Sequence, residues 1–307
     1  MQIIENLDSY FSSEPLALSL GMFDGVHLGH QSIINNLIQK AEQKNLRPAL
    51  LTFWPHPRLV FNPNDELKLL NTLEEKLDLI KLLGVEYVFL QEFNEEFRSL
   101  SGEDFVRDIL VNKLNVQHLI IGYDHVFGKN RSGNFQLLEK LAPELGFEVE
   151  KMEAVNVHEN NVSSTKIRIA LEEGAIEEAT VMLGYPYRVR GEVVHGRKLG
   201  RTLGYPTANL KIDPIKQLPS NGAYIVSVWV EDNEFMGMAS IGTNPTVNEG
   251  KQLSVEVNIL DFEYDIYGKT IEIQFHEFLH PEIKFSSLEE LIDKLKQDEK
   301  ETRKFFS

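Results

Sequence analysis

The sequence contains no cysteine among its 307 residues. That absence excludes a disulfide framework, a thiolate metal site and a cysteine nucleophile. Long hydrophobic runs are also missing, since no apolar stretch approaches the ~20 residues that cross a bilayer. The first residues, MQIIENLDSYFSSEP, carry acidic side chains where a secretory signal carries basic ones. We therefore expect a cytoplasmic protein without a membrane partner.

Positive charge is scarce in this chain. Its 31 Lys and Arg residues stand against 47 Asp and Glu residues, which gives a formal net charge of −16. A field of that sign repels nucleic acid and anionic membranes unless a basic patch is held locally, so we expect no nucleic-acid partner. An anionic small molecule such as ATP can still bind where helix ends, backbone amides, a few cations or a metal ion reverse the local sign.

The length and a 42% hydrophobic composition favour two globular domains, each with its own core. In the first half, short apolar runs alternate with longer amphipathic stretches, beginning with LALSL at 16–20 and a helical pattern to about residue 45. Apolar runs between helices predict a doubly wound α/β domain with a parallel sheet, covered on both faces, that binds ligands at the carboxyl ends of its strands.

The pattern changes after about residue 184, where Gly, Pro and β-branched residues become more frequent. Runs such as GAYIVSVWV and LSVEVNIL, bounded by turn signals, predict a small antiparallel sheet or barrel. The final stretch, SSLEELIDKLKQ, predicts a capped amphipathic helix that packs on it. A helical stretch of about residues 164–183, ending at Gly184, joins the halves, so we place the domains at 1–183 and 184–307.

The string LALSLGMFDGVHLGH places a buried strand, a glycine-containing turn and a helix start in succession, with His27 and His30 on either side of Gly29. A helix N-terminus attracts phosphate through its free amides and its dipole, and glycine permits close backbone approach. Two imidazoles at this spacing can donate hydrogen bonds to phosphate oxygens as charge develops. Two histidines near a helix start can also be incidental, and the four-residue pattern alone does not decide between these interpretations.

The longer string GMFDGVHLGH resembles the HxGH signature of the α/β nucleotidylyltransferase superfamily and, within it, the bacterial FAD synthetases; FWPHP, GYDHVFGKNRSGN and SSTKIR follow in the family's order. The resemblance implies that His27 and His30 bind and stabilise the phosphates of ATP while the SSTKIR segment closes over them. The serines of SSTKIR would equally serve as a helix N-cap. His125 stands where the family usually has an aromatic residue. The nucleotide- and flavin-binding residues implied are Gly21, Phe23, Asp24, Gly25, Gly29, His56, Asp124, Ser163, Ser164, Thr165 and Arg168.

A second string, GEVVHGRKLGRTLGYPTANL, contains a basic glycine-rich loop that can wrap phosphates with its amides. Pro206 rigidifies the chain that follows. Thr207 and Asn209 are hard oxygen donors on one face of an extended segment, so both can bind one Mg²⁺ together with ATP phosphates. Without the PTAN sequence, a Gly/Arg-rich stretch would be typical of a solvated turn. The loop residues are Gly196, Arg197, Lys198, Gly200, Arg201 and Gly204.

This second string resembles the riboflavin kinase signature, and riboflavin kinase domains are small six-stranded barrels. In EVNILDF, which resembles the family's E-x-[HN]-x-x-D-F pattern, the resemblance makes Glu256 the catalytic base. A carboxylate that accepts a proton suits a kinase acting on a hydroxyl, although the strand pattern alone also fits an ordinary surface glutamate. Asn258 and His280 stand where the family often has histidine and arginine.

Taken over essentially the whole chain, the resemblance implies a bifunctional enzyme of flavin biosynthesis. Residues 184–307 would convert riboflavin and ATP to FMN and ADP, and residues 1–183 would convert FMN and ATP to FAD and diphosphate. The expected small-molecule partners are ATP, Mg²⁺, riboflavin, FMN and FAD. A monofunctional FMN adenylyltransferase with a regulatory flavin-binding barrel is the alternative, and weak self-association stays open. The acidic balance disfavours a tRNA substrate.

Overall fold

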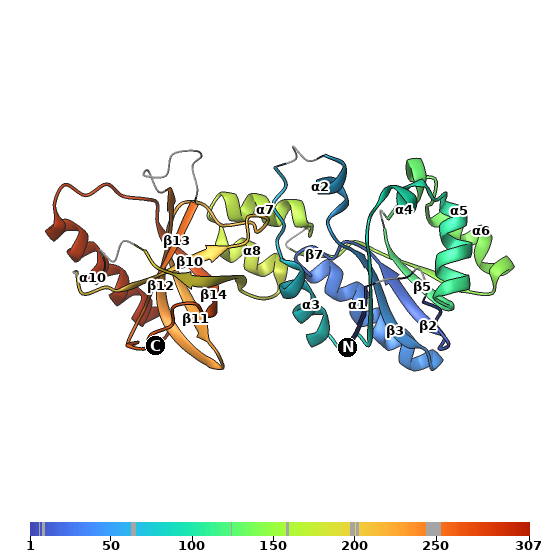
Figure 1. Ribbon diagram of the computed structural model, residues 1–307, viewed down its shortest axis with the longest axis horizontal. Coiled ribbons are helices and arrows are strands. Elements are labelled where there is room, and N and C mark those ends of the chain that lie inside the picture. Colours follow the sequence, from blue (N-terminus) through green and yellow to red (C-terminus); the bar gives the residue numbers. More distant parts are fainter. Residues whose placement is uncertain are drawn as a thin grey trace. The chain divides into compact units, whose positions relative to one another are not determined.

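The computed structural model describes residues 1–5, 7, 10–62, 66–123, 125–157, 160–196, 200, 203–243 and 253–307. The chain divides into two compact units, Met1–Ser163 and Ser164–Ser307. A parallel sheet forms the centre of the first unit, and a closed antiparallel barrel forms the centre of the second (Figure 1).

The sheet of the first unit has six strands in the order β1-β4-β3-β2-β5-β6, and every neighbouring pair is parallel. The chain moves outward from β2 to β3 and β4, and then crosses back to β5 on the other side of β2. Ligands of open α/β sheets bind at the carboxyl ends of the strands beside such a reversal. The strands are β1 (Gln2–Ile4), β2 (Leu16–Leu20), β3 (Arg47–Phe53), β4 (Tyr87–Gln91), β5 (Val116–Gly122) and β6 (Glu148–Met152).

Helices cover both faces of this sheet, which confirms the predicted doubly wound class (Figure 1). On one face of the sheet, Leu18, Leu51 and Leu119 are fully buried in a core that they share with Phe105 and Leu138. Alternate residues of a strand point to one face, which is why the contributing strand positions are two apart. One face carries α1 (Leu28–Lys44) and α3 (Leu73–Leu82), and the other carries α5 (Gly102–Asp104), the π-helix η1 (Phe105–Lys113) and α6 (Phe135–Leu145). Two short helices, α2 (Pro57–Phe61) and α4 (Glu95–Ser99), and the strand pair β7 (Asn156–Val157) and β8 (Asn160–Asn161) complete the unit.

The second unit is a closed six-stranded barrel in the order β10-β13-β12-β11-β14-β9, with all pairs antiparallel. Closure pairs every strand on both sides, so the barrel has no free sheet edge. Tyr187, Tyr224 and Phe275 are fully buried in its interior. The strands are β9 (Tyr187–Val194), β10 (Thr207–Ile212), β11 (Gly222–Val230), β12 (Asn233–Thr243), β13 (Leu253–Ile259) and β14 (Thr270–His280).

Helices in the described ranges also accompany the barrel. The predicted helical stretch over 164–183 consists of two helices, α7 (Ser164–Glu172) and α8 (Ile176–Leu183), because Gly174 between them has a left-handed backbone with φ of 77°. Both helices belong to the same compact unit as the barrel, and α8 packs against β9 and β14. The compact unit thus begins before the predicted domain boundary at 183/184. The last helix, α10 (Leu288–Phe305), packs on β12, and Ser287 caps its N-terminus.

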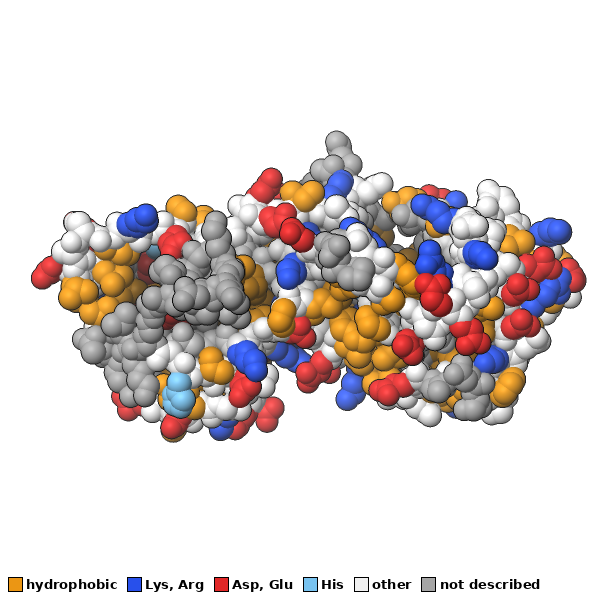
Figure 2. Space-filling view, turned by 45° about the horizontal axis from the view of Figure 1, so that its top comes forward, with side chains coloured by type: hydrophobic (Ala, Val, Ile, Leu, Met, Phe, Trp, Pro, Cys, Tyr) orange, Lys and Arg blue, Asp and Glu red, His pale blue; other side chains and the backbone are white. Residues whose placement is uncertain are grey.

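On the face drawn in Figure 2, Asp and Glu side chains are interspersed with Lys and Arg side chains in each unit. None of the helices in the described ranges is both long and apolar enough to cross a bilayer.

Two candidate active sites

The first candidate site is the turn between β2 and α1, beside the reversal of strand order. His27 is the N-cap of α1, and its Nδ1 accepts a hydrogen bond from the backbone N–H of His30 at 3.4 Å. The two imidazole rings stack with centroids 3.7 Å apart. A β-carbon at Gly29 would lie 3.1 Å from the ring of His27, so the glycine leaves room for this stacked pair. The structure therefore gives a local reason for each residue of the His-x-Gly-His pattern.

The turn has an unusual backbone. Phe23, Gly25 and Val26 all have positive φ angles, of 50°, 86° and 35°. Such angles are strained for Phe and Val, so the surrounding structure must hold the turn in place. The buried carboxylate of Asp24 does part of this, since its Oδ1 accepts hydrogen bonds from the backbone N–H groups of Leu70 and Asn71 at 2.9 and 3.3 Å.

The electrostatics at the histidine pair disfavour protonation. Burial, and then the positive charges of His27 and Lys76, hold the pKa of His30 well below its usual range. Within the part of the chain that the structure describes, the buried Nδ1 of His30 has no hydrogen-bond partner. A neutral imidazole with an unsatisfied buried nitrogen is a group that a bound ligand can satisfy.

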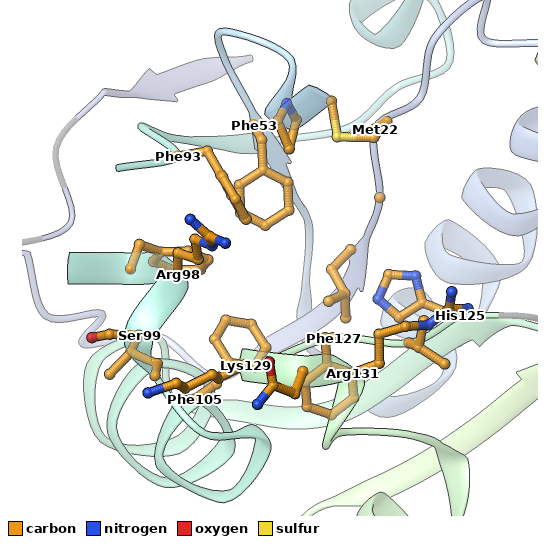
Figure 3. Close-up of a pocket in the computed structure, with 18 of the residues that line it drawn as sticks. Met22, Phe53, Phe93, Arg98, Ser99, Phe105, His125, Phe127, Lys129 and Arg131 are labelled. Carbon is orange, nitrogen blue, oxygen red and sulfur yellow. The ribbon is translucent and has the colours of Figure 1, made fainter. Parts of the chain in front are cut away.

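A cavity of about 870 Å³ opens at the carboxyl ends of the strands next to this turn. Four strand ends supply its walls, through Leu20 to Met22 after β2, Phe53 at the end of β3, Phe93 after β4 and 125–131 after β5. In Figure 3, Met22, Phe53 and Phe93 lie on one side, across from Phe105, Phe127, Lys129 and Arg131. The cavity therefore combines aromatic walls with three basic side chains, Arg98, Lys129 and Arg131.

Two glycines of the GYDHVFGKNRSGN segment shape this cavity. A β-carbon at Gly133 would overlap the ring of Phe127, and Gly128 has a φ of 71° in close contact with the backbone of Gly102. The imidazole of His125 lines the cavity and stacks on Phe127, with centroids 6.1 Å apart.

The remaining residues predicted for the first site lie at other element ends. Gly21 lines the cavity, and His56 caps α2, where its Nδ1 accepts a hydrogen bond from the N–H of Arg58 at 3.2 Å. Asp124 lies outside the described residues. Ser164, Thr165 and Arg168 lie at the start of α7, where the second compact unit begins, and Ser163 is the last residue of the first unit. Their approach to the histidine pair stays a prediction.

The second candidate site lies on β10 and β13 of the barrel. Asn209 faces Glu256 across the two strands, and Thr207 Oγ1 donates a hydrogen bond to Glu256 Oε2 at 3.0 Å. Residues that face each other across an antiparallel pair share one side of the sheet, so three oxygen-bearing side chains are brought together. Hydroxyl, amide and carboxylate oxygens are ligands that suit Mg²⁺.

Neighbouring residues hold this oxygen cluster in place. Asn258 Nδ2 donates a hydrogen bond to the carbonyl of Pro206 at 2.7 Å, directly before Thr207. A β-carbon at Gly196 would overlap the side-chain amide of Asn209, so this glycine lets the backbone approach the amide closely. The sequence left the role of Asn258 undecided, and the structure assigns it a contact that positions the PTAN segment.

The loop before β10 is described only in part. A β-carbon at Gly200 would overlap the carbonyl oxygen of Tyr205, and Gly204 has a φ of 82°, which favours glycine. The predicted phosphate-binding residues Arg197, Lys198 and Arg201 lie outside the described residues.

A second cavity, of about 590 Å³, adjoins Thr207. His195 and Tyr267 line it with ring centroids 3.9 Å apart, and Phe262 and Tyr264 provide further aromatic surface. His280, by contrast, points to the C-terminal helix, where its Nε2 lies 3.0 Å from Asp298 Oδ2. Among the described residues no cluster of three or more His, Asp or Glu side chains could hold a metal ion.

Several residues of both sites carry no local sequence signal. The cavity aromatics Phe53, Phe93 and Phe127 come from three separate segments, and Tyr267 comes from a turn far from the PTAN string. These residues line the cavities only because of the order of the strands in the fold, and a single motif does not encode that order.

Comparisons with known proteins agree with this architecture. The sequence matches the FAD synthetase family model over residues 11–166 and the riboflavin kinase family model over residues 183–306. It is 43% identical over 291 residues to the bifunctional riboflavin kinase/FMN adenylyltransferase of Listeria monocytogenes, covering 94% of this chain and 92% of that protein. The Bacillus subtilis protein of the same name is 38% identical over 294 residues, with 94% and 92% covered.

A solved structure shows the same fold. A crystal structure from Streptococcus pneumoniae, described as a macrolide-efflux protein, is similar to this chain with a TM-score of 0.89 and 33% identity, over 98% of each chain. The efflux description concerns that protein. The sequence matches over both halves and the fold together place this chain in the family of bifunctional riboflavin kinase/FMN adenylyltransferases.

Proposed function

We propose that the chain performs two consecutive ATP-dependent transfers, phosphorylation of riboflavin by residues 184–307 and adenylylation of FMN by residues 1–183. The observation that carries this proposal is the presence of two sites, a pair of imidazoles in the first unit and a cluster of side-chain oxygens on the barrel. Each lies beside its own aromatic cavity. Matches to a family model in each half favour two activities over the alternative of an adenylyltransferase with a regulatory barrel.

The adenylylation step uses the first site. An oxygen of the FMN phosphate attacks the α-phosphorus of ATP, and the bond from this phosphorus to the bridging oxygen breaks, so that diphosphate leaves. His27 accepts a hydrogen bond at Nδ1, which in the neutral ring places its proton on Nε2, where it can be donated to a phosphate oxygen. The N-terminus of α1 adds a favourable dipole. Catalysis in this site is therefore orientation and charge stabilisation without a covalent enzyme intermediate.

The aromatic cavity fits the flavin of this step. An isoalloxazine ring is large, flat and mostly apolar, and ligand cavities of such molecules are lined by aromatic side chains with a few placed polar groups. Phe53 and Phe93 on one side, with Phe127 on the other, provide the apolar surface. Lys129 and Arg131 provide positive charge for the FMN phosphate.

The phosphorylation step uses the second site. The 5′-hydroxyl oxygen of riboflavin attacks the γ-phosphorus of ATP, the bond from this phosphorus to the β–γ bridging oxygen breaks, and ADP leaves. Glu256 accepts the hydroxyl proton, and its hydrogen bond with Thr207 orients the carboxylate. Thr207 and Asn209 would hold Mg²⁺, which when bound offsets the negative charge of the phosphates. The cytoplasm, expected from the sequence, is a compartment that supplies ATP for both steps.

Product chromatography tests the proposal. Incubation of the purified protein with riboflavin, ATP and Mg²⁺ should yield FMN and FAD, and incubation with FMN should yield FAD. If FAD forms from FMN but riboflavin is not phosphorylated, the barrel is a binding module and the monofunctional alternative holds.

A further inference from the structure

A buried lysine lies beside the first site and has no part in the proposed chemistry. Lys76, in the first turns of α3, is only 3% exposed. Its Nζ donates hydrogen bonds to Thr52 Oγ1 at 3.1 Å and to the carbonyl of Met22 at 3.4 Å, and it lies 5.4 Å from the ring centre of Trp54. Thr52 Oγ1 itself lies 3.3 Å from the same Met22 carbonyl. The lysine thus links a helix, a strand and the catalytic turn.

Burying an ammonium group is unfavourable, because the charge loses its hydration. Burial accordingly lowers the pKa of Lys76 from 10.5 to about 8, and the nearby charge of Asp24 opposes this shift. An apolar side chain at this position would avoid that cost. Strongly perturbed groups of this kind cluster at functional sites.

The group that Lys76 holds is the start of the catalytic turn. Met22 precedes the positive-φ residues Phe23 and Val26, and Asp24 ties the same turn to the backbone just before α3. The turn is therefore attached to the α3 region at two successive points, by the ammonium at the Met22 carbonyl and by the Asp24 carboxylate. Met22 also lines the aromatic cavity, so the same contact fixes one of its walls.

We infer that Lys76 is a positioning residue for adenylyl transfer, whose ammonium holds the Met22 carbonyl and thereby orients the turn that carries the stacked pair His27 and His30. Its burial keeps it from contacting substrate, so it acts through the turn. The inference rests on the proposed adenylylation of FMN by this unit. A misplacement of about 1 Å in a catalytic group can reduce a rate by about a hundredfold, which sets the scale of the effect.

The experiment replaces Lys76 with Met, a side chain of similar length without charge or donor, and follows both activities of the full chain. We expect kcat for FAD formation from FMN to fall by about tenfold to a hundredfold, by a larger factor than KM for ATP rises. Riboflavin phosphorylation, measured on the same preparation, should stay within about twofold of wild type because its site is in the other unit. Lys81→Met, on the exposed part of the same helix, is the matched control and should leave both activities unchanged.

A second readout separates an electrostatic role from a merely structural one. Because the Lys76 charge contributes to the low pKa of His30, NMR titration should show a higher His30 pKa in Lys76→Met and an unchanged one in Lys81→Met. Thr52→Val should reduce FAD formation in the same direction, and Thr52→Ser, which retains the hydroxyl, should restore it.

Three results would overturn the inference: FAD formation by Lys76→Met at the wild-type rate, an equal loss of both activities, or, if Lys76→Met does not fold, a Thr52→Val variant that forms FAD as wild type does. Failure of the proposed function would look different, because the wild-type protein itself would then form no FAD. Wild-type FAD formation with no effect of the variants contradicts only the role of Lys76.

Discussion

The imidazole rings of His27 and His30 stack with their planes only 16° from parallel and their centroids 3.7 Å apart. Two positive charges at this separation would repel each other, and burial further disfavours the charged form of His30. The imidazole of His30 is therefore neutral at neutral pH.

The first prediction concerns the titration of this pair. Since burial is the main cause of the low pKa of His30 and the charge of His27 the next, His27→Ala should raise the pKa of His30 while leaving it below the usual value of 6.5. NMR titration of the imidazole carbons measures this. A His30 that titrates near 6.5 in the wild-type protein would contradict the described burial.

The pH dependence of stability provides a second prediction. The folded pKa of Lys76, about 8, is below its unfolded value of 10.5, so between these pH values the unfolded state binds more protons and stability rises with pH. The unfolding free energy of wild type relative to Lys76→Met should therefore increase from pH 8 to 10.5, by up to about 3 kcal/mol. Urea unfolding at several pH values measures the difference. A difference that stays constant or falls over this range would show that Lys76 titrates normally.

The aromatic cavity leads to a third prediction. Phe93→Ala removes one wall and should raise KM for FMN in FAD formation by about tenfold, because aromatic contacts to a flat ring contribute about 1–3 kcal/mol. Riboflavin phosphorylation should be unaffected. Phe11, which is 66% exposed and outside the cavity lining, supplies the control variant Phe11→Ala. If both variants have the wild-type KM, the flavin binds elsewhere.

The fourth prediction concerns Asn258. Asn258→Ala removes the hydrogen bond to the Pro206 carbonyl and should lower kcat for riboflavin phosphorylation by about tenfold, the scale of one lost buried hydrogen bond. FAD formation from FMN serves as the internal control in the same chain. Unchanged phosphorylation would mean that the PTAN segment keeps its position without this contact.

Much of the fold could be predicted from the sequence where the pattern is local. The apolar runs 16–20, 116–122 and 222–230 coincide with β2, β5 and β11, because each is bounded by polar or glycine-containing turns. The sequence also predicts the helical stretch over 164–183, and the positive φ of Gly174 divides it into two helices. Hydrophobic periodicity continues across such a break, so the pattern alone does not reveal it.

The candidate sites were predictable only in their contiguous parts. His27 and His30, three residues apart in one motif, stack as that motif allows, whereas the hydrogen bond between Thr207 and Glu256 joins two motifs 49 residues apart. The roles of these residues in binding stay predictions. Lys76 was not predictable, since in sequence it looks like Lys81, another lysine of the same amphipathic helix. What separates the two is the packing of α3 on β3, a contact between segments far apart in the chain.

The separation of the two activities is the central claim, and reciprocal variants test it most directly. The measurement is the initial rate of riboflavin phosphorylation and of FAD formation from FMN, in wild type, His30→Ala and Glu256→Ala. The account predicts that His30→Ala loses at least about a hundredfold in FAD formation and keeps riboflavin phosphorylation, and that Glu256→Ala does the reverse. Equal loss of both activities in either variant would contradict two separate sites.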